Sequence, residues 1–258
     1  MDKQYQQVNP LAASSPQAFI DQMAKLPLAY HPGEGWVYSV SVDIQGYLVE
    51  KLSGKPLPQF LSERIFQPLG MKDTAFFVPP EKMSRLATIY SYNAQQKALV
   101  GAPPDPGVNT LPGFPQGGGG LYSTADDYLL FTQMLLNGGQ LHGARVLAPS
   151  SVQLMRSNRV PDAVKLIGKS GIGGFTLQPG VGFGLDFAVL EDPTKVGSTA
   201  GKGTYSWGGI AGTWFWIDPA NDLVFVGIIQ RRGGVPGAPS IDEMARQLTY
   251  QALVEPSK

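Results

Sequence analysis

The sequence predicts an α+β fold, because helix-forming patterns fill its first two thirds and strand-forming patterns its last third. In the earlier part, apolar side chains recur three and four residues apart, as on one face of a helix. In the later part, the aromatic run 213–217 and the apolar run 223–230 flank a polar turn at residues 218–222. This order is typical of helices followed by an antiparallel sheet, and not of alternating β-α-β units.

Several segments have the start and stop signals of helices. The expected helices begin at Pro16, run from about Val40 to Gly54, span residues 58–66, follow Ser123 as far as Gly138, run from Pro149 to about Arg156, and end the chain at residues 240–254. The clearest is the helix after Ser123, because Asp126 follows that serine three residues later and two glycines end the apolar pattern.

The last third contains the expected strands. Residues 182–189 alternate in polarity like one strand, and the runs 213–217 and 223–230 predict an antiparallel hairpin buried on both faces. Residues 103–120 are rich in Gly and Pro and predict a long loop. The glycine run 117–120 is interpreted as a close-packed approach to the Ser123 helix and not as a phosphate site, because no basic residue lies beside it.

Length and composition restrict the possible functions. The 258 residues fit one domain, 1–258, with a mostly helical and loop part at about 15–160 and the strands with the final helix at about 180–258. The formal net charge is +0, so the sequence predicts no nucleic-acid partner. Its longest apolar run, 223–229, is too short to span a membrane, and the polar N-terminus indicates no secretory signal, which favours a cytoplasmic location.

The sequence contains little that indicates a metal site, a thiol nucleophile or a nucleotide-binding loop. The absence of cysteine excludes disulfides, zinc–thiolate sites and a thiol nucleophile. His31 and His142 lie apart in loops without acidic partners at metal spacing, so no metal and no cofactor is expected. The run Gly168-Lys169-Ser170 fits a loose phosphate-loop pattern but lacks the strand before it and the helix after it.

Two segments are candidates for chemistry. Trp207-Gly208-Gly209 precedes the aromatic hairpin, and glycines in a strand indicate either a bulge or a strand edge whose N–H groups can bind an oxyanion. Tyr38 stands at a helix entry, where a tyrosine is usually structural. No Gly-x-Ser-x-Gly occurs, so the nucleophile elbow of α/β-hydrolases is absent from the sequence.

Four segments in this order resemble the serine β-lactamase-like superfamily. They are residues 32–40 with Asp43 and 46–50, residues 68–74, residues 118–128, and residues 206–213 with 216–219. The resemblance extends from about residue 15 to 250. Trp207-Gly208-Gly209, where other members have Lys-Thr-Gly, is most similar to the family VIII carboxylesterases.

The resemblance implies a β-lactamase/transpeptidase-like fold, with an antiparallel sheet flanked by helices and a helical subdomain. It also implies an acyl-enzyme mechanism in which a serine attacks the carbonyl and a lysine and a tyrosine move the proton. Tyr38 matches that tyrosine. Trp207, Gly208 and Gly209 match the third motif, and the N–H of Ile210 would be an oxyanion donor.

Two departures from the family pattern shape the functional expectation. Val40 stands where many members have Asn, which favours short acyl esters over β-lactams as substrates. No serine has Lys three residues later, so the nucleophile is unknown, and Ser198 with Lys202 is a poor substitute. We therefore expect a chain that lacks the N-terminal strands and nucleophile helix of the family.

Three readings follow from the resemblance. The first is a carboxylesterase whose site is incomplete in this chain. The second is a non-catalytic remnant or binding scaffold, and the third is a relative of β-lactamases or D-Ala-D-Ala peptidases. If strands are missing, the strand 223–230 becomes an open apolar edge, through which we expect self-association or complementation by another chain.

Overall fold

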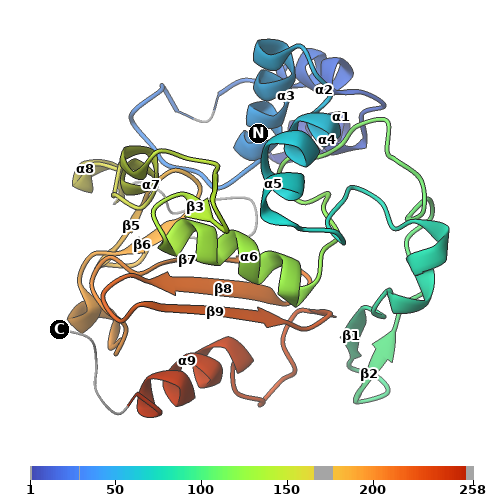
Figure 1. Ribbon diagram of the computed structural model, residues 1–258. Coiled ribbons are helices and arrows are strands. Elements are labelled where there is room, and N and C mark those ends of the chain that lie inside the picture. The colour runs from blue at the N-terminus through green and yellow to red at the C-terminus, as the bar shows by residue number, and fades with distance from the viewer. Residues whose placement is uncertain (1, 29, 166–176, 254–258) are drawn as a thin grey trace.

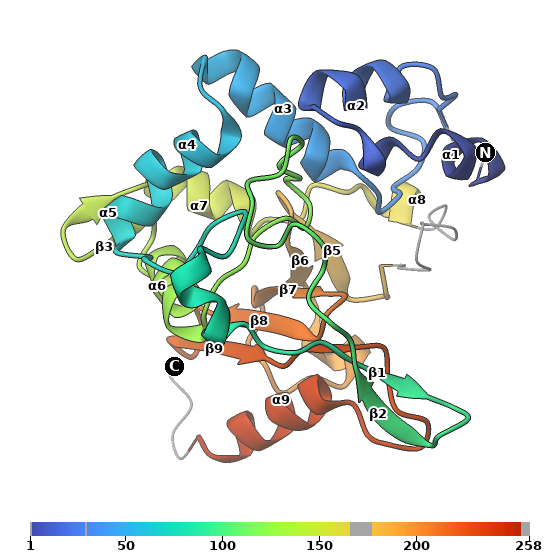
Figure 2. The same ribbon diagram turned by 90° about the vertical axis from the view of Figure 1, so that its right-hand side faces the viewer.

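The computed structural model describes residues 2–28, 30–165 and 177–253. The fold is α+β, as predicted, with the helices α1–α5 on one side of an antiparallel sheet (Figure 1). The helix α6 (Ala125–Leu136) crosses one face of the sheet, and α9 (Ile241–Gln251) lies beyond β9 in both views (Figures 1 and 2). No helix of the described residues is long and apolar enough to cross a membrane.

The main sheet has five antiparallel strands in the order β5-β6-β7-β8-β9. They are β5 (Val181–Phe183), β6 (Ala188–Leu190), β7 (Tyr205–Gly209), β8 (Thr213–Asp218) and β9 (Leu223–Ile228). The predicted hairpin is confirmed, because β8 pairs with β9 from Thr213 opposite Ile228 to Asp218 opposite Leu223.

The predicted single strand 182–189 is wrong, because the chain reverses between β5 and β6. Asp186 adopts a left-handed conformation at φ 64°, and the Gly184 N–H donates to the Phe187 carbonyl at 2.8 Å. The neighbouring Leu185 N–H donates to the Met155 carbonyl at 3.0 Å. The reversal thus depends on a contact with α7 (Pro149–Met155), which the alternation of residues 182–189 does not reveal.

The strand β8 separates two apolar cores. Phe215 and Ile217 pack with residues of α6 on one face, while Trp216 packs with Tyr250 of α9 on the other. Successive side chains of a strand point to opposite faces, so an uninterrupted apolar run is the pattern of a strand covered on both sides. The Trp216 ring stacks on Phe225 of β9 at 4.1 Å between centroids.

The helical part is longer than predicted at its start and in its middle. Its elements are α1 (Asp2–Val8), a 3-10 helix (Pro10–Ala12), α2 (Pro16–Met23), α3 (Ser41–Ser53), α4 (Leu57–Leu61), a π-helical turn (Ser62–Phe66) and α5 (Gln67–Leu69). The helix expected at residues 58–66 therefore continues to Leu69. It ends at Gly70, whose φ of 76° is easily adopted only by glycine.

The remaining elements are short. They are a 3-10 helix (Pro80–Arg85), β1 (Tyr90–Asn93), β2 (Ala98–Gly101), β3 (Gln140–Leu141), β4 (Ala144–Arg145), α8 (Asp162–Lys165), a 3-10 helix (Pro193–Val196) and β10 (Arg231–Arg232). The strand β1 pairs with β2 and, in parallel, with β10, which forms a small second sheet. The final helix ends at Gln251, slightly short of the predicted span.

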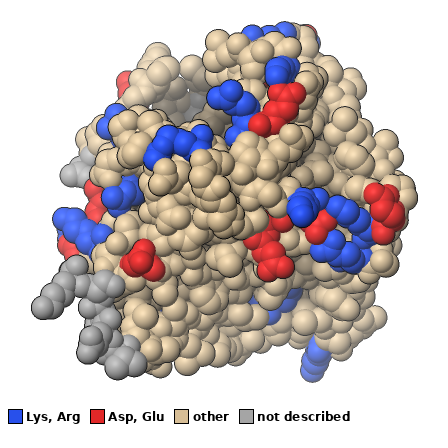
Figure 3. Space-filling model, viewed as in Figure 1, with Lys and Arg blue, Asp and Glu red and all other residues tan. Residues whose placement is uncertain are grey.

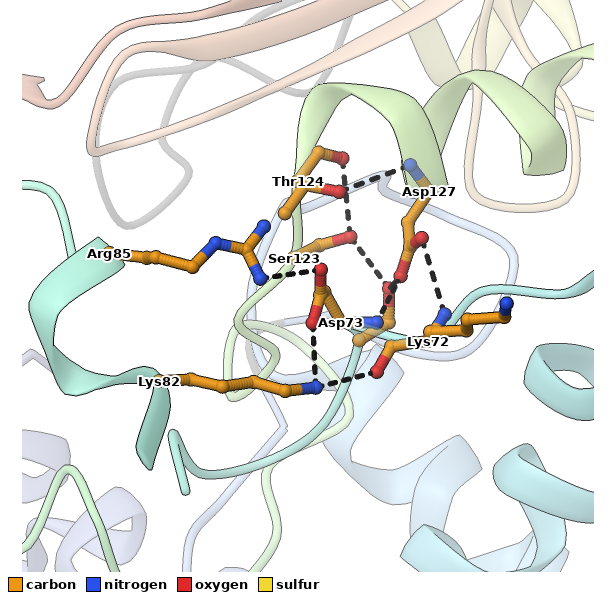
Figure 4. Close-up of polar contacts among 8 residues, drawn as sticks. Lys72, Asp73, Lys82, Arg85, Ser123, Thr124 and Asp127 are labelled. Carbon is orange, nitrogen blue, oxygen red and sulfur yellow. Dashed lines mark hydrogen bonds and ion pairs between the residues drawn. The ribbon is translucent and has the colours of Figure 1, made fainter. Parts of the chain in front are cut away.

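The start of α6 is set by a polar network that corrects the predicted cap. Thr124 is the N-cap, and its hydroxyl accepts a hydrogen bond from the Asp127 N–H at 3.2 Å. Figure 4 shows this bond between Thr124 and Asp127. The Ser123 hydroxyl instead lies 2.7 Å from the Thr74 hydroxyl. Asp127, which is buried, accepts from the Asp73 N–H at 2.7 Å and from Thr74 at 2.8 Å. The segment after α5 is thereby fastened to α6.

Candidate functional site

Tyr38 lies against the strand that carries the glycine motif. Its ring centroid is 5.2 Å from that of Trp207 on β7, with an interplanar angle of 50°. Phe183 of β5 packs edge-on against Trp207 at 5.4 Å, and Trp36 packs against Phe183 at 5.0 Å. These four partly buried rings form one aromatic cluster, which joins the segment before α3 to the sheet.

Local structure explains how two of the rings enter the cluster. Trp36 and Tyr38 are two residues apart in a segment without helix or turn, and side chains two apart on an extended chain point the same way. Val40, the N-cap of α3, is 7% exposed and anchors the end of this segment among Phe19 and Phe114. The structure therefore brings together Tyr38 and Trp207, the first two of the predicted site residues.

Gly208 and Gly209 are exposed at the end of β7. The described pairing of β6 with β7 stops at Ser206, so β7 extends past its neighbour on that side. A β-carbon at Gly209 would lie 2.5 Å from the Thr213 hydroxyl, which explains why the hairpin needs glycine there. Among the described residues, these two glycines form an exposed strand end; their role in binding a substrate stays a prediction.

Ile210 does not continue the strand. It lies in the tight turn that the Gly212 N–H closes onto the Gly209 carbonyl at 3.0 Å, and its side chain is 88% exposed. Its own N–H has no hydrogen-bond partner in the part of the chain that the structure describes. The role of this N–H as an oxyanion donor stays a prediction.

A groove of about 440 Å³ opens beside this turn. Its walls are the end of the β7–β8 hairpin, the chain after β9 and the start of α9, including Gly208, Gly209, Ile210, Trp214, Ile229, Arg231 and Ile241. The groove is mainly apolar, with Arg231 and Asp242 as charged members. It offers space for a small organic group next to the candidate oxyanion segment.

The glycine run 117–120 packs closely, with Gly117 and Gly118 against the first turn of α3. The Gly118 N–H donates to the Asp43 carboxylate at 3.0 Å, and a β-carbon at Gly117 would overlap the Val42 carbonyl. Asp43 is 5% exposed, and burial raises the pKa of its carboxyl above the usual range. The sequence analysis did not predict that Asp43 holds the loop of residues 117–120. The one local indication was its place in the first turn of α3, where an acidic side chain is favourable.

The other candidates lie away from this cluster or outside what can be described. His31 and His142 are both exposed. The Ser198 hydroxyl accepts a hydrogen bond from the Ala200 N–H at 3.1 Å. Ser198 lies in the loop that precedes β7, and the Gly201 N–H of this loop donates to the Asp218 carboxylate. Gly209 lies at the other end of that strand, about 13 Å away for four residues. The run Gly168-Lys169-Ser170 lies outside the described residues.

The described residues contain no group of three or more His, Cys, Asp or Glu side chains that could hold a metal. Charged side chains of both signs occur in small groups separated by uncharged surface on the face seen in Figure 3. The features that stand out around Tyr38 and Trp207 are aromatic rings and exposed backbone.

Comparison with known proteins shows the family to which the chain belongs. Residues 2–249 match the sequence profile of the Beta-lactamase family. The chain is 38% identical over 255 residues to Protein Rv1367c of Mycobacterium tuberculosis. The alignment covers 92% of this chain and 63% of that protein. It is 32% identical to Esterase EstB of Burkholderia gladioli, over 78% of this chain and 51% of the esterase.

The fold is also similar to a solved structure, that of EstCE1, a hydrolase with promiscuous acyltransferase activity. The TM-score is 0.74 at 26% identity, over 88% of this chain and 61% of EstCE1. This chain spans less than two thirds of the length of each of these three relatives. Because the profile match extends over almost all of its residues, the chain belongs to the β-lactamase family, within the serine β-lactamase-like superfamily that also contains esterases.

Proposed function

We propose that this chain provides part of the site of a serine carboxylesterase that hydrolyses short acyl esters. The observation that carries the proposal is the contact between Tyr38 and Trp207, beside the exposed backbone of Gly208 and Gly209. A proton-transfer group and an oxyanion segment must both reach one carbonyl carbon, so they have to be neighbours.

The chemistry assigned to these residues is acyl transfer. A serine oxygen forms a bond to the ester carbonyl carbon, and the carbonyl oxygen becomes an oxyanion held by the Ile210 N–H. The Tyr38 hydroxyl relays the serine proton to the departing alcohol. Water then repeats the sequence on the acyl-enzyme and releases the acid. The serine itself stays unassigned, because this sequence has no Ser-x-x-Lys.

Ester substrates are favoured over β-lactams by two features. The motif Trp207-Gly208-Gly209 and Val40 both depart from the pattern of β-lactam-hydrolysing relatives. EstB and EstCE1, which carry the names of an esterase and a hydrolase, support the same choice. The absent Ser-x-x-Lys favours one alternative, in which the chain is a scaffold that binds acyl compounds without hydrolysing them.

The experiment is to treat the 258-residue chain with a fluorophosphonate, read by intact mass, and to assay p-nitrophenyl acetate and butyrate in parallel. If this chain itself supplies the serine, one adduct and turnover result, and Tyr38→Phe should lower that turnover roughly 100-fold or more. Tyr47→Phe is the control, because Tyr47 lies on the neighbouring helix α3 and its hydroxyl donates to Gln17 at 2.8 Å.

Each outcome has a distinct meaning. An adduct whose peptide maps to one serine identifies the nucleophile. If neither adduct nor turnover is found, the chain does not supply the nucleophile, and the binding scaffold is the reading left for the chain by itself. Hydrolysis of a chromogenic cephalosporin at a rate that matches the esters would overturn the choice of substrate class.

A further inference from the structure

The first turn of α3 is joined to a segment that lies far away in the sequence. The Gly118 N–H donates to the Asp43 carboxylate at 3.0 Å, across 75 residues of chain. A β-carbon at Gly117 would lie 2.4 Å from the Val42 carbonyl, so the backbone of the glycine run rests directly on the helix. Figure 2 shows the green chain before α6 reaching α3. We call residues 113–120 the strap.

The strap connects the N-terminal helices with α6. On one side, Phe114 of the strap stacks on Phe19 of α2 at 4.8 Å between ring centroids. On the other side, Tyr122 exchanges backbone hydrogen bonds with Ala75, directly before α6 begins. The strap thus passes α3 on its way between two fixed points, and the Asp43 carboxylate holds it at that crossing.

The start of α3 depends on the same carboxylate. Val40 stands at the N-cap, and its side chain makes no capping hydrogen bond. Asp43 is the third residue of this helix, where a negative charge compensates the positive end of the helix dipole. Among the described residues, the partners of its carboxylate are backbone N–H groups, those of Gly118 and of Asp43 itself. One charge therefore supports both the helix start and the strap.

The position of Tyr38 follows from where α3 begins. Tyr38 lies in a stretch without helix or turn that leads directly into Val40. Val40 is buried together with Phe19 of α2 and Phe114 of the strap. The Tyr38 ring lies 5.2 Å from Trp207 between centroids. Because Val40 packs on the strap and is close to Tyr38 in sequence, a displaced strap would also displace the Tyr38 ring.

We propose that Asp43 is a positioning residue for Tyr38, which it holds against Trp207 by fastening the strap to the start of α3. The inference rests on the proposed function, in which the Tyr38 hydroxyl moves the proton, and it adds a residue that touches neither substrate nor reacting atoms. An asparagine keeps one acceptor oxygen for the Gly118 N–H, and its neutral amide is cheaper to bury than a charge. Asp43→Asn should therefore keep Tyr38 in place, and Asp43→Ala should release it.

The first test reads the position of the Tyr38 ring by NMR, because a ring beside Trp207 has resonances displaced from those of an exposed tyrosine. The 258-residue chain is labelled at its tyrosine rings, and Tyr38→Phe assigns the signal. In Asp43→Ala we expect the Tyr38 signal to move toward the value of an exposed tyrosine. The Gly118 amide should also exchange roughly 10-fold faster or more, since it loses a charged acceptor. Asp43→Asn should retain most of the Tyr38 displacement.

Asp127 provides a matched control for the loss of a buried carboxylate. It is likewise buried, is the third residue of a helix, α6, and accepts the N–H of a distant residue, Asp73. Asp127→Ala should therefore also destabilise the chain, but it should leave the Tyr38 signal where it is. An unmoved Tyr38 signal in folded Asp43→Ala, or an equal movement in Asp127→Ala, would overturn the proposal.

Two glycine variants test the contact from the strap side, in case Asp43→Ala does not fold. A β-carbon at Gly118 would lie 2.9 Å from an Asp43 carboxylate oxygen, whereas one at Gly119 meets no atom within 4 Å. Gly118→Ala should move the Tyr38 signal in the same direction as Asp43→Ala, and Gly119→Ala should leave it unchanged. Equal signals in the two glycine variants would contradict the proposal.

None of these measurements uses turnover, so the positioning role and the proposed function can fail separately. A Tyr38 signal that moves in Gly118→Ala and not in Gly119→Ala supports the positioning role even in a chain without esterase activity. A signal that stays in place in Gly118→Ala overturns the positioning role even in a chain that hydrolyses esters.

Discussion

Tyr250 of α9 donates a hydrogen bond of 2.7 Å to the carboxylate of Asp218, the residue that ends β8. Asp218 is completely buried, and its carboxylate also accepts from the Gly201 N–H at 2.8 Å and from the Asn221 side chain at 2.7 Å. One carboxylate therefore connects the last helix, the loop before β7 and the β8–β9 turn. Buried charged groups are stable only when hydrogen-bonded in this way.

Replacing Asp218 with Asn should lower the free energy of unfolding by about 2–4 kcal/mol. The new amide turns one acceptor into a donor that faces other donors, and the network loses its charge. Urea unfolding followed by tryptophan fluorescence measures the effect. Asp222→Asn, at an exposed position of the same turn, should change stability little, and an equal loss in both variants would argue against the network.

The same carboxylate predicts a pH dependence. Burial alone would raise the pKa of Asp218, but the hydrogen bonds from Asn221, Gly201, Tyr250 and Ala220 together lower it below its usual range. A lowered folded-state pKa stabilises the protein above the unfolded value of about 3.9, and this contribution is lost as the pH falls through the folded value. The stability difference between the native chain and Asp218→Asn should therefore be constant near neutral pH and shrink below about pH 4. A difference that grows on acidification would contradict this assignment.

Gly227 of β9 should not accept a side chain. A β-carbon there would overlap the indole ring of Trp214, which lies opposite it in the β8–β9 register. Gly227→Ala should destabilise the fold by about 2 kcal/mol or more, because the ring cannot move without disturbing the core under α9. Gly234→Ala is the control, because its added β-carbon meets no atom within 4 Å. In thermal melts, Gly227→Ala should have the clearly lower midpoint of the two variants.

The Thr74 hydroxyl should matter more than that of Ser123. Thr74 donates to the buried Asp127 carboxylate at 2.8 Å, whereas Ser123 is exposed and can bond water instead. Thr74→Val should lower the free energy of unfolding by about 1–3 kcal/mol, since the carboxylate loses a donor. Ser123→Ala should have the smaller effect in the same denaturant titration, and the reverse order would show that the network is assigned wrongly.

Local patterns predicted the elements whose formation depends on neighbours in sequence. The hairpin of β8 and β9 was predicted because an apolar run, a polar turn and a second apolar run are sufficient to specify it. The cap of α6 was predicted one residue early, since Ser123 and Thr124 are both good caps. Only the contact of Ser123 with Thr74 distinguishes them.

The candidate site residues were named from the sequence, and their roles stay predictions. Tyr38 and the segment Trp207–Gly209 were identified from a resemblance, but nothing local to either segment indicates that the other is near. Their rings meet because the extended chain before α3 crosses the end of β7, a contact between distant parts of the sequence. The carboxylates of Asp43 and Asp127 were missed as structural anchors for the same reason, since their partners are 54 to 75 residues away.

The sequence by itself determined the order of helices and strands, the two-faced burial of β8 and the family to which the chain belongs, because these depend on residue types and short spacings. Only the tertiary structure decided that residues 182–189 reverse into two strands and that Ile210 lies in a turn. Those features depend on hydrogen bonds between segments far apart in the chain, and their energies appear only when folding brings the partners together.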